Sequence, residues 1–228
     1  MAIAFDSFVL TAATADLTDE ARARNHADAV EFRMGLSNAD DALAALEAYD
    51  GQLPVLATNR AAWEGGEWAG DDAERLEVLA EAARIDGVEA IDVELESLRS
   101  GAADDVLETA REQDVSVVAS THDFEGTPSE DAMIERLAEA CEYADVGKLA
   151  VTAHDRSDSL AVLSATHRLT QDGETVATMA MGEAGSHTRA VAPLYGSRIG
   201  YAPVDPAEAT APGQYDLATL SRLVSDLE

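Results

Sequence analysis

Residues 116–153 read SVVASTHDFEGTPSEDAMIERLAEACEYADVGKLAVTA. The stretch begins and ends with runs of β-branched and small apolar residues, Ser116–His122 and Gly147–Ala153, which are typical of buried strands. Between them, Ser129–Tyr143 has apolar residues at helical spacing, and Ser129 is a suitable N-cap before the acidic residues of a first turn. The stretch therefore predicts a strand, a helix and a second, parallel strand.

The same alternation extends through the rest of the sequence. Eight strands are predicted, at Phe8–Ala13, Ala29–Met34, Pro54–Arg60, Ala90–Leu95, Ser116–His122, Gly147–Ala153, Thr175–Met181 and Ser197–Ala202. Helices are predicted at Thr18–His26, Ala39–Ala48, Asp71–Ile85, Ala102–Gln113, Ser129–Tyr143, Ser157–Thr170, Ser186–Leu194 and Tyr215–Asp226. Such βα units, joined without a linker rich in Pro, Gly or Ser, predict an α/β protein with one closed (β/α)8 barrel, a single domain over residues 1–228. An open doubly wound sheet is the alternative.

The charge of the chain limits the partners that it can have. Its 45 acidic and 15 basic side chains give a formal net charge of −30, and the acidic residues are spread along the whole sequence. Such a surface repels nucleic acid and anionic lipid, so we expect neither as a partner. In molar salt the Debye length falls to about 3 Å, which screens the self-repulsion of the surface. The composition therefore predicts a halophilic protein.

The expected compartment is the cytoplasm. No apolar stretch approaches the roughly 18 residues of a membrane span, and no charged region followed by an apolar core opens the sequence. The single cysteine, Cys141, cannot form an internal disulfide, and its helical context predicts a buried, unreactive thiol.

Lys148 is the only lysine in the sequence, and the other 14 basic side chains are arginines. Arginine can replace lysine as a solvated charge, but its guanidinium stays protonated and cannot form an imine. A lysine in the apolar run Val146–Val151 would be partly desolvated, and both burial and nearby arginines would disfavour its charged form. Lys148 is therefore the candidate Schiff-base nucleophile. A lysine that snorkels at a strand end is the alternative.

His122 ends the strand that precedes the one with Lys148. Adjacent parallel strands lie about 4.8 Å apart, so the imidazole could reach a substrate carbon held as an imine on the lysine. Histidine suits proton transfer near neutral pH, which makes His122 a candidate general base. A structural histidine that pairs with Asp123 is the alternative.

Other polar side chains occur at the predicted carboxyl ends of strands or in the loops that follow. Glu31 and Arg33 lie on one face of the second strand, because strand side chains alternate, and they predict either a binding site for a polar substrate or a structural ion pair. Arg189, Thr210 and Gln214 are a suitable set for one carboxylate, since arginine can bind it with two charge-assisted hydrogen bonds. No cluster of His, Cys and acidic residues has the spacing of a zinc site.

Taken together, these segments resemble the type I 3-dehydroquinate dehydratases. The matching pieces are Glu31-Phe32-Arg33, Arg60 with Glu64-Gly65-Gly66, Asp92-Val93-Glu94-Leu95, Ser120-Thr121-His122-Asp123-Phe124, Lys148-Leu149-Ala150-Val151, Met181-Gly182 with Gly185 and Arg189, and Ala211-Pro212-Gly213-Gln214. They occur in the order of the family, so the resemblance extends over nearly the whole chain.

The resemblance implies a role for each of the matching residues. It places imine formation with the ketone of 3-dehydroquinate on Lys148, proton transfer on His122, and assistance to that histidine on Glu64. It implies substrate binding by Glu31, Arg33, Arg60, Arg189, Thr210 and Gln214, with the last three at the carboxylate. It also implies a homodimer that needs neither a metal nor an organic cofactor.

The sequence departs from the family pattern at three positions. Thr188 and Thr210 occupy places where serine is usual, and Tyr201 falls near a position that is often phenylalanine. Two rival functions stay open: another class I lysine barrel, such as an aldolase of the transaldolase kind, and a barrel that binds a carboxylated metabolite without converting it. The Glu-x-Arg, His-Asp-Phe and Ala-Pro-Gly-Gln set favours the dehydratase over such an aldolase.

Overall fold

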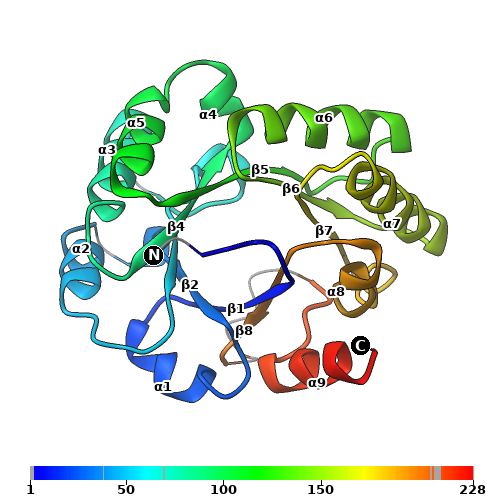
Figure 1. Ribbon diagram of the computed structural model, residues 1–228, viewed down its shortest axis with the longest axis horizontal. Helices are drawn as coiled ribbons and strands as arrows, with labels where there is room; N and C mark the ends of the chain where they lie inside the picture. The colour runs from blue at the N-terminus through cyan, green and yellow to red at the C-terminus, as the bar shows by residue number, and fades with distance from the viewer. Residues whose placement is uncertain (1–2, 38, 69, 206, 208–211, 228) are drawn as a thin grey trace.

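The computed structural model describes residues 3–37, 39–68, 70–205, 207 and 212–227. Its parallel strands are β1 (Val9–Thr14), β2 (Ala29–Arg33), β3 (Val55–Thr58), β4 (Val88–Glu94), β5 (Ser116–Asp123), β6 (Val146–Thr152), β7 (Val176–Met181) and β8 (Ile199–Pro203). They lie side by side in chain order, and β8 returns to pair with β1 (Figure 1). A doubly wound sheet would reverse its strand order at a switch point, so the predicted (β/α)8 barrel is confirmed and the open sheet was wrong.

The barrel is nearly closed between β7 and β8. The other neighbouring strands form parallel ladders in the described structure, with one register shift between β3 and β4 at Val55 and Leu56. Across the β7–β8 seam, the Arg198 amide donates to the Val176 carbonyl oxygen at 2.8 Å, and the Thr178 amide donates to Ser197 Oγ at 3.0 Å. A side chain thus replaces part of the backbone ladder at this seam.

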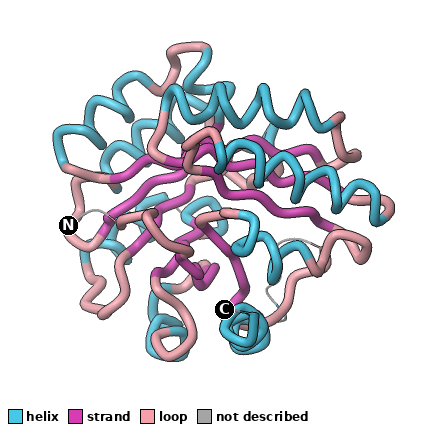
Figure 2. Tube along the Cα trace, turned by 45° about the vertical axis from the view of Figure 1, so that its right-hand side comes forward, coloured by secondary structure: helices cyan, strands magenta, loops and turns pink. Residues whose placement is uncertain are grey.

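Helices surround the barrel and follow the strands as expected (Figure 2). The α-helices are α1 (Glu20–Ala23), α2 (Ala39–Glu47), α3 (Asp72–Ala82), α4 (Leu95–Arg99), α5 (Asp104–Gln113), α6 (Glu130–Tyr143), α7 (Arg156–Gln171), α8 (Thr188–Val191) and α9 (Leu217–Leu227). Short 3-10 helices occupy Leu17–Asp19 (η1), Met34–Leu36 (η2), Ala62–Glu64 (η3) and Ala192–Tyr195 (η4). The helices predicted at Thr18–His26 and Ser186–Leu194 are therefore shorter than expected and partly 3-10.

One helix was missed by the sequence analysis. Leu95, predicted as the last residue of a strand, is the first residue of α4, where Leu95 and Leu98 are both buried. Two apolar residues are too few to show a helical period.

Several helix starts have the polar caps that the sequence suggests. The side chain of Asp71 accepts a hydrogen bond from the Glu74 amide at the start of α3, and Ser129 accepts one from Ala132 at the start of α6. Asp155 and Asp158 form a reciprocal capping box at α7. These side chains satisfy amides that a helix leaves unpaired in its first turn.

The core has an inner and an outer part. Inside the barrel, small and branched side chains such as Leu56, Ala90 and Val118 pack with Ile3 and Phe5 from the N-terminal segment. That segment, dark blue in Figure 1, crosses one end of the barrel, where the Ile3 carbonyl accepts a hydrogen bond from Ser116 Oγ. The outer parts fill the space between strands and helices.

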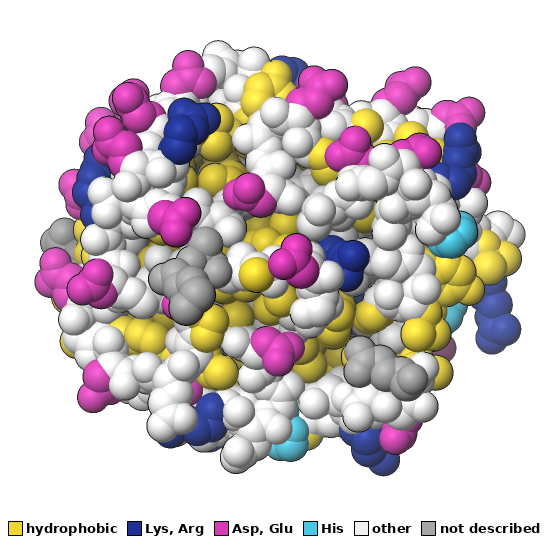
Figure 3. Space-filling model, in the orientation of Figure 1, with side chains coloured by type: hydrophobic (Ala, Val, Ile, Leu, Met, Phe, Trp, Pro, Cys, Tyr) yellow, Lys and Arg dark blue, Asp and Glu magenta, His cyan; other side chains and the backbone are white. Residues whose placement is uncertain are grey.

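Acidic side chains are common on the surface of the protein. On the face shown in Figure 3, acidic side chains are scattered and interspersed with a few basic ones. Within the described residues, no helix combines the length and the apolar character that crossing a bilayer requires.

Candidate active site

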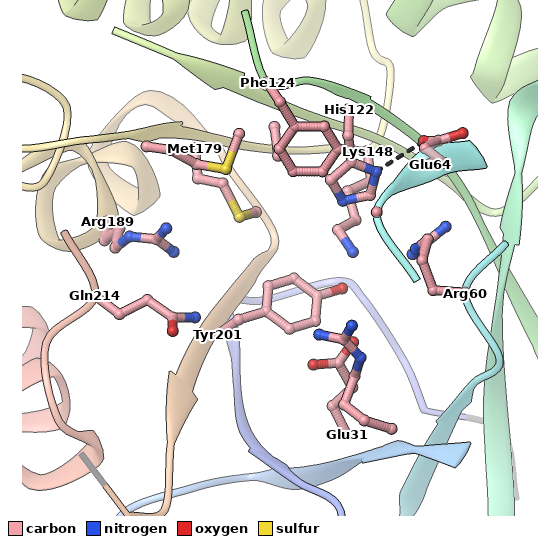
Figure 4. Close-up of a pocket in the computed structure, with 14 residues that line it drawn as sticks. Glu31, Arg60, Glu64, His122, Phe124, Lys148, Met179, Arg189, Tyr201 and Gln214 are labelled. Carbon is pink, nitrogen blue, oxygen red and sulfur yellow. Dashed lines mark hydrogen bonds and ion pairs between the residues drawn. The ribbon is translucent and has the colours of Figure 1, made fainter. Parts of the chain in front are cut away.

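A pocket opens at the carboxyl ends of the strands, where (β/α)8 barrels hold their reactive groups. It has about 600 Å³ of empty space that includes open solvent. The lining residues are Glu31, Arg33, Arg60, Glu64, Gly65, His122, Phe124, Lys148, Ala150, Met179, Met181, Arg189, Tyr201 and Gln214. They come from most strands of the barrel, and Figure 4 shows the labelled side chains converging on one space.

Lys148 lies on β6 with its amine inside the barrel. The residue is 4% exposed, so its side chain does not snorkel to solvent. Its Nζ donates a hydrogen bond to Asp92 Oδ2 at 2.8 Å and lies 4.3 Å from the ring centroid of Tyr201, over the ring face. The arginines were expected to be its main electrostatic neighbours, but the direct partner is the carboxylate of Asp92. A buried ammonium is stabilised by such a counter-charge and by an aromatic face.

The second carboxylate oxygen of Asp92 binds two further side chains in the floor of the pocket. This Oδ1 atom accepts hydrogen bonds of 2.6 Å from both Arg60 Nη2 and Ser120 Oγ. Arg60 Nη1 donates to Glu94 Oε1 at 3.0 Å, and Arg75 Nη1 forms an ion pair with Glu94 Oε2 at 2.8 Å. Ion pairs between side chains of alternating charge thus connect Lys148, through the barrel wall, to Arg75 on α3.

The charged groups in this row of ion pairs shift one another's pKa values. Burial by itself would raise the pKa of Asp92, but the positive charges of Arg60 and Lys148 and the hydrogen bonds to it hold that pKa well below its usual range. Burial would lower the pKa of Arg60, and Asp92 and Glu94 raise it instead. Asp92 is therefore a permanent anion, which can neutralise a cation at Lys148.

We expect Asp92→Asn to destabilise the protein by about 3–5 kcal/mol, because it leaves Arg60 and Lys148 buried without their shared counter-charge. Urea denaturation in molar potassium chloride measures the free energy of unfolding. The matched control is Glu139→Gln, which breaks a surface ion pair with Arg99 and should cost about 0–1 kcal/mol. Equal losses in the two variants would contradict the role given to Asp92.

A second pair, His122 and Glu64, lies beside Lys148, because β5 and β6 are neighbouring strands. His122 lies near the end of β5, and its Nδ1 is 2.7 Å from Oε1 of Glu64, which lies on η3 after β3 (Figure 4). The alternative partner, Asp123, instead accepts hydrogen bonds from the amides of Glu125 and Gly126. Since Nδ1 is held by Glu64, Nε2 is the ring nitrogen left for chemistry.

The pair is buried, and burial opposes charge on both members. It raises the pKa of Glu64 to about 8, with the negative charges of Glu94 and Asp92 adding to the rise and Arg60 and Lys148 opposing it. Burial, followed by the positive charges of Arg60 and Lys148, lowers the pKa of His122 well below its usual value. At neutral pH the pair therefore holds one proton on Glu64 and a neutral imidazole, and Nε2 of that ring becomes able to accept a proton once Glu64 ionises.

The rest of the pocket is suited to binding a polar anion. Glu31 accepts a hydrogen bond from Thr58 Oγ1 at 3.0 Å, and Arg33 lines the same pocket. Across the pocket, the Nε of Arg189 is buried and has no hydrogen-bond partner among the residues that the structure describes. Burial lowers the pKa of Arg189 to about 10, so it still carries a positive charge at neutral pH. Gln214 lies beside Arg189 (Figure 4).

The structure brings together eight of the nine residues singled out from the sequence: Glu31, Arg33, Arg60, Glu64, His122, Lys148, Arg189 and Gln214 all line the pocket. The ninth, Thr210, lies outside the described residues. Tyr201, whose contact was uncertain, also lines the pocket, and its buried hydroxyl has no hydrogen-bond partner in the described part of the chain.

The contacts of Asp92 with Lys148 and Arg60 were not predicted from the sequence. The matching piece Asp92-Val93-Glu94 was noted, but no contact was assigned to either carboxylate. Their spacing of two residues on a strand was the available signal, because it directs both side chains to the same face.

The chain is similar to known proteins along almost its full length. The family description "Type I 3-dehydroquinase" matches residues 7–227. A 3-dehydroquinate dehydratase of Haloarcula marismortui is 57% identical over 227 residues, which covers 98% of each chain. The crystal structure of 3-dehydroquinate dehydratase from Geobacillus kaustophilus has a TM-score of 0.87 and 27% identity, and covers 97% of this chain and 91% of that one.

A further crystal structure, of the type I enzyme from Clostridium difficile with covalently modified comenic acid, has a TM-score of 0.85 and 26% identity, with 97% of this chain and 92% of that one covered. Fold, pocket and sequence agree along almost the full length of the chain. The protein therefore belongs to the type I 3-dehydroquinase family.

Proposed function

We propose that this protein is a hydro-lyase that converts 3-dehydroquinate to 3-dehydroshikimate and water, in the shikimate pathway of aromatic amino-acid biosynthesis. The observation that carries the proposal is the solitary lysine amine in the pocket, facing a paired histidine and glutamate. The family match and the 57% identity to the Haloarcula marismortui enzyme support the same reaction.

The proposed reaction begins with an imine. The ammonium of Lys148 gives up a proton, and the neutral amine attacks the ketone carbon of the substrate, which loses its oxygen as water. The product of this step is a protonated imine, and its positive charge replaces that of the ammonium beside Asp92. The carboxylate and the Tyr201 ring face therefore stabilise the cationic intermediate as they stabilise the resting ammonium.

The elimination then requires two proton transfers. His122 takes a proton from the carbon beside the imine, and the electron pair left behind is delocalised onto the imine nitrogen as an enamine. The hydroxyl group on the next carbon leaves with a proton from the imidazolium, as water, and the electron pair forms the carbon–carbon double bond. Water finally hydrolyses the imine and restores the Lys148 amine.

Substrate binding is assigned to both sides of the pocket. Glu31, Arg33 and Arg60 bind ring hydroxyls in this proposal, and Arg189 with Gln214 binds the carboxylate. Arg189 can take this role because its buried Nε is otherwise unused by the described residues. We include Thr210 at the carboxylate from the family resemblance alone.

Borohydride trapping tests the proposal. Sodium borohydride added with 3-dehydroquinate in molar potassium chloride should reduce the imine and leave a substrate adduct on the peptide that contains Lys148, as read by mass spectrometry. Appearance of the conjugated product is followed by absorbance in the same buffer. Turnover without an adduct would contradict the imine mechanism, and the absence of both would favour a barrel that only binds a metabolite.

The rival of the aldolase kind predicts a different product. Such an enzyme would also form the adduct, but it would cleave a carbon–carbon bond and give no conjugated product.

As part of the same proposal, and from the family resemblance, we infer a homodimer in the cytoplasm, with residues 1–228 acting as one catalytic domain. Its acidic surface suits a cytoplasm of high salt.

A further inference from the structure

Phe124 is a large apolar side chain that stays half exposed on a highly acidic protein. The residue is 52% exposed, at the mouth of the pocket, two positions after His122. Its ring lies parallel to the imidazole, with 5.7 Å between the ring centroids and an interplanar angle of 8° (Figure 4). About half of the residue therefore remains in water while its ring stacks, with an offset, beside the imidazole.

The same ring also contacts the loop that carries Glu64. A Cβ placed on Gly65 would lie 2.6 Å from Phe124 Cζ, closer than real Cβ atoms approach a neighbour. Gly65 has a φ of +80°, a left-handed conformation that glycine adopts without strain. A side chain at position 65 would therefore collide with the Phe124 ring and displace it.

We propose that Phe124 is a positioning residue for proton transfer: its ring holds the His122 imidazole flat against the Glu64 loop and keeps water from the pair. This inference rests on the proposed role of His122 as the base. Phe124 acts through His122, because the imidazole makes the proton transfer itself. The orientation of the ring then fixes the direction in which Nε2 faces the substrate.

The first test compares Phe124→Ala with Phe124→Tyr, which keeps the flat ring. We expect kcat of Phe124→Ala to fall about tenfold, the upper end of the value of an aromatic pair, with KM changed less than about twofold. Phe124→Tyr should stay within about twofold of the unchanged protein. Circular dichroism and the melting temperature establish that both variants are folded, as expected for a half-exposed position.

An isotope effect separates positioning from a merely structural role. The substrate is deuterated at the carbon that loses its proton. If Phe124 orients the base, proton abstraction becomes slower relative to the other steps, so the deuterium effect on kcat should increase in Phe124→Ala and stay unchanged in Phe124→Tyr. An unchanged isotope effect in Phe124→Ala, or an equal loss of activity in the two variants, would overturn the proposal.

Gly65→Ala provides a second, independent variant. Its methyl group should push the phenylalanine ring off the imidazole and so lower kcat and raise the isotope effect, as Phe124→Ala does. The double variant should lose less than the product of the two single losses, because the added methyl no longer meets a ring. Fully multiplicative losses would show that the two residues act independently, against the proposal.

These results are distinguishable from failure of the proposed function itself. If His122 is not the base, His122→Asn will keep turning over substrate, whatever happens at Phe124. If His122 is the base and Phe124 does not position it, His122→Asn will be inactive and Phe124→Ala will behave like the unchanged protein.

Discussion

Lys148→Arg should abolish dehydration, with kcat reduced by about four orders of magnitude or more, as for loss of other enzyme nucleophiles. Arginine keeps a positive charge beside Asp92, so the buried ion pair and the fold should survive. The guanidinium cannot form an imine, and for this reason only the chemistry is lost. The initial rate of product formation in molar potassium chloride is the measurement.

The control for this variant is its stability. Its midpoint of urea denaturation should stay near that of the unchanged protein, and borohydride should leave no adduct on it. A folded Lys148→Arg protein that dehydrates the substrate at an undiminished rate would show that no covalent intermediate is needed.

His122→Asn should lower kcat by about 10²–10⁴, the usual contribution of a general acid and base. Imine formation uses the Lys148 amine, so the borohydride adduct should still appear in this variant. Retention of the adduct together with loss of turnover would place His122 after the imine. Loss of both would instead mean that His122 is needed to form the imine, which contradicts its assignment to the later proton transfer.

The pH dependence of kcat/KM should report the ionisation of Glu64, the partner of His122. Below a pH of about 8 the carboxyl of Glu64 keeps its proton and donates it to Nδ1 of His122, which leaves hydrogen on Nε2. Above the raised pKa of about 8, Glu64 is a carboxylate, Nδ1 carries the hydrogen, and Nε2 is free to accept a proton. Activity should therefore rise as the pH increases through about 8. The matched variant Glu64→Gln, whose side chain does not titrate, should lack this rise.

Much of the barrel could be predicted from sequence because each strand is a short, buried, apolar run followed by a polar residue or a loop. The errors occur where the elements are shortest. Leu95 was assigned to a strand, and the region Thr18–His26 was given one long helix where η1 and α1 form. Segments of four or five residues are too short for their periodicity to separate a helix from a strand end.

For the site, the sequence revealed which side chains are chemically unusual but not how they pair. Asp92 and Lys148 stand 56 residues apart on β4 and β6, with β5 between them, and they meet across the interior of the barrel. Such a contact depends on the tilt of the strands and on the space that small neighbours leave, neither of which is written in a local pattern. Thr210 lies outside the described residues and stays a prediction.

The sparse bonding of the β7–β8 seam gives the two halves of the pocket different compliance. The chain after β7 and β8 carries Arg189 and Gln214, whereas Lys148 and His122 stand on β6 and β5, which are joined by a continuous ladder. Small opening motions cost least where backbone hydrogen bonds are fewest. We therefore expect thermal opening of the barrel to be largest at the β7–β8 seam, beside Arg189 and Gln214, and smallest between β5 and β6, which hold His122 and Lys148.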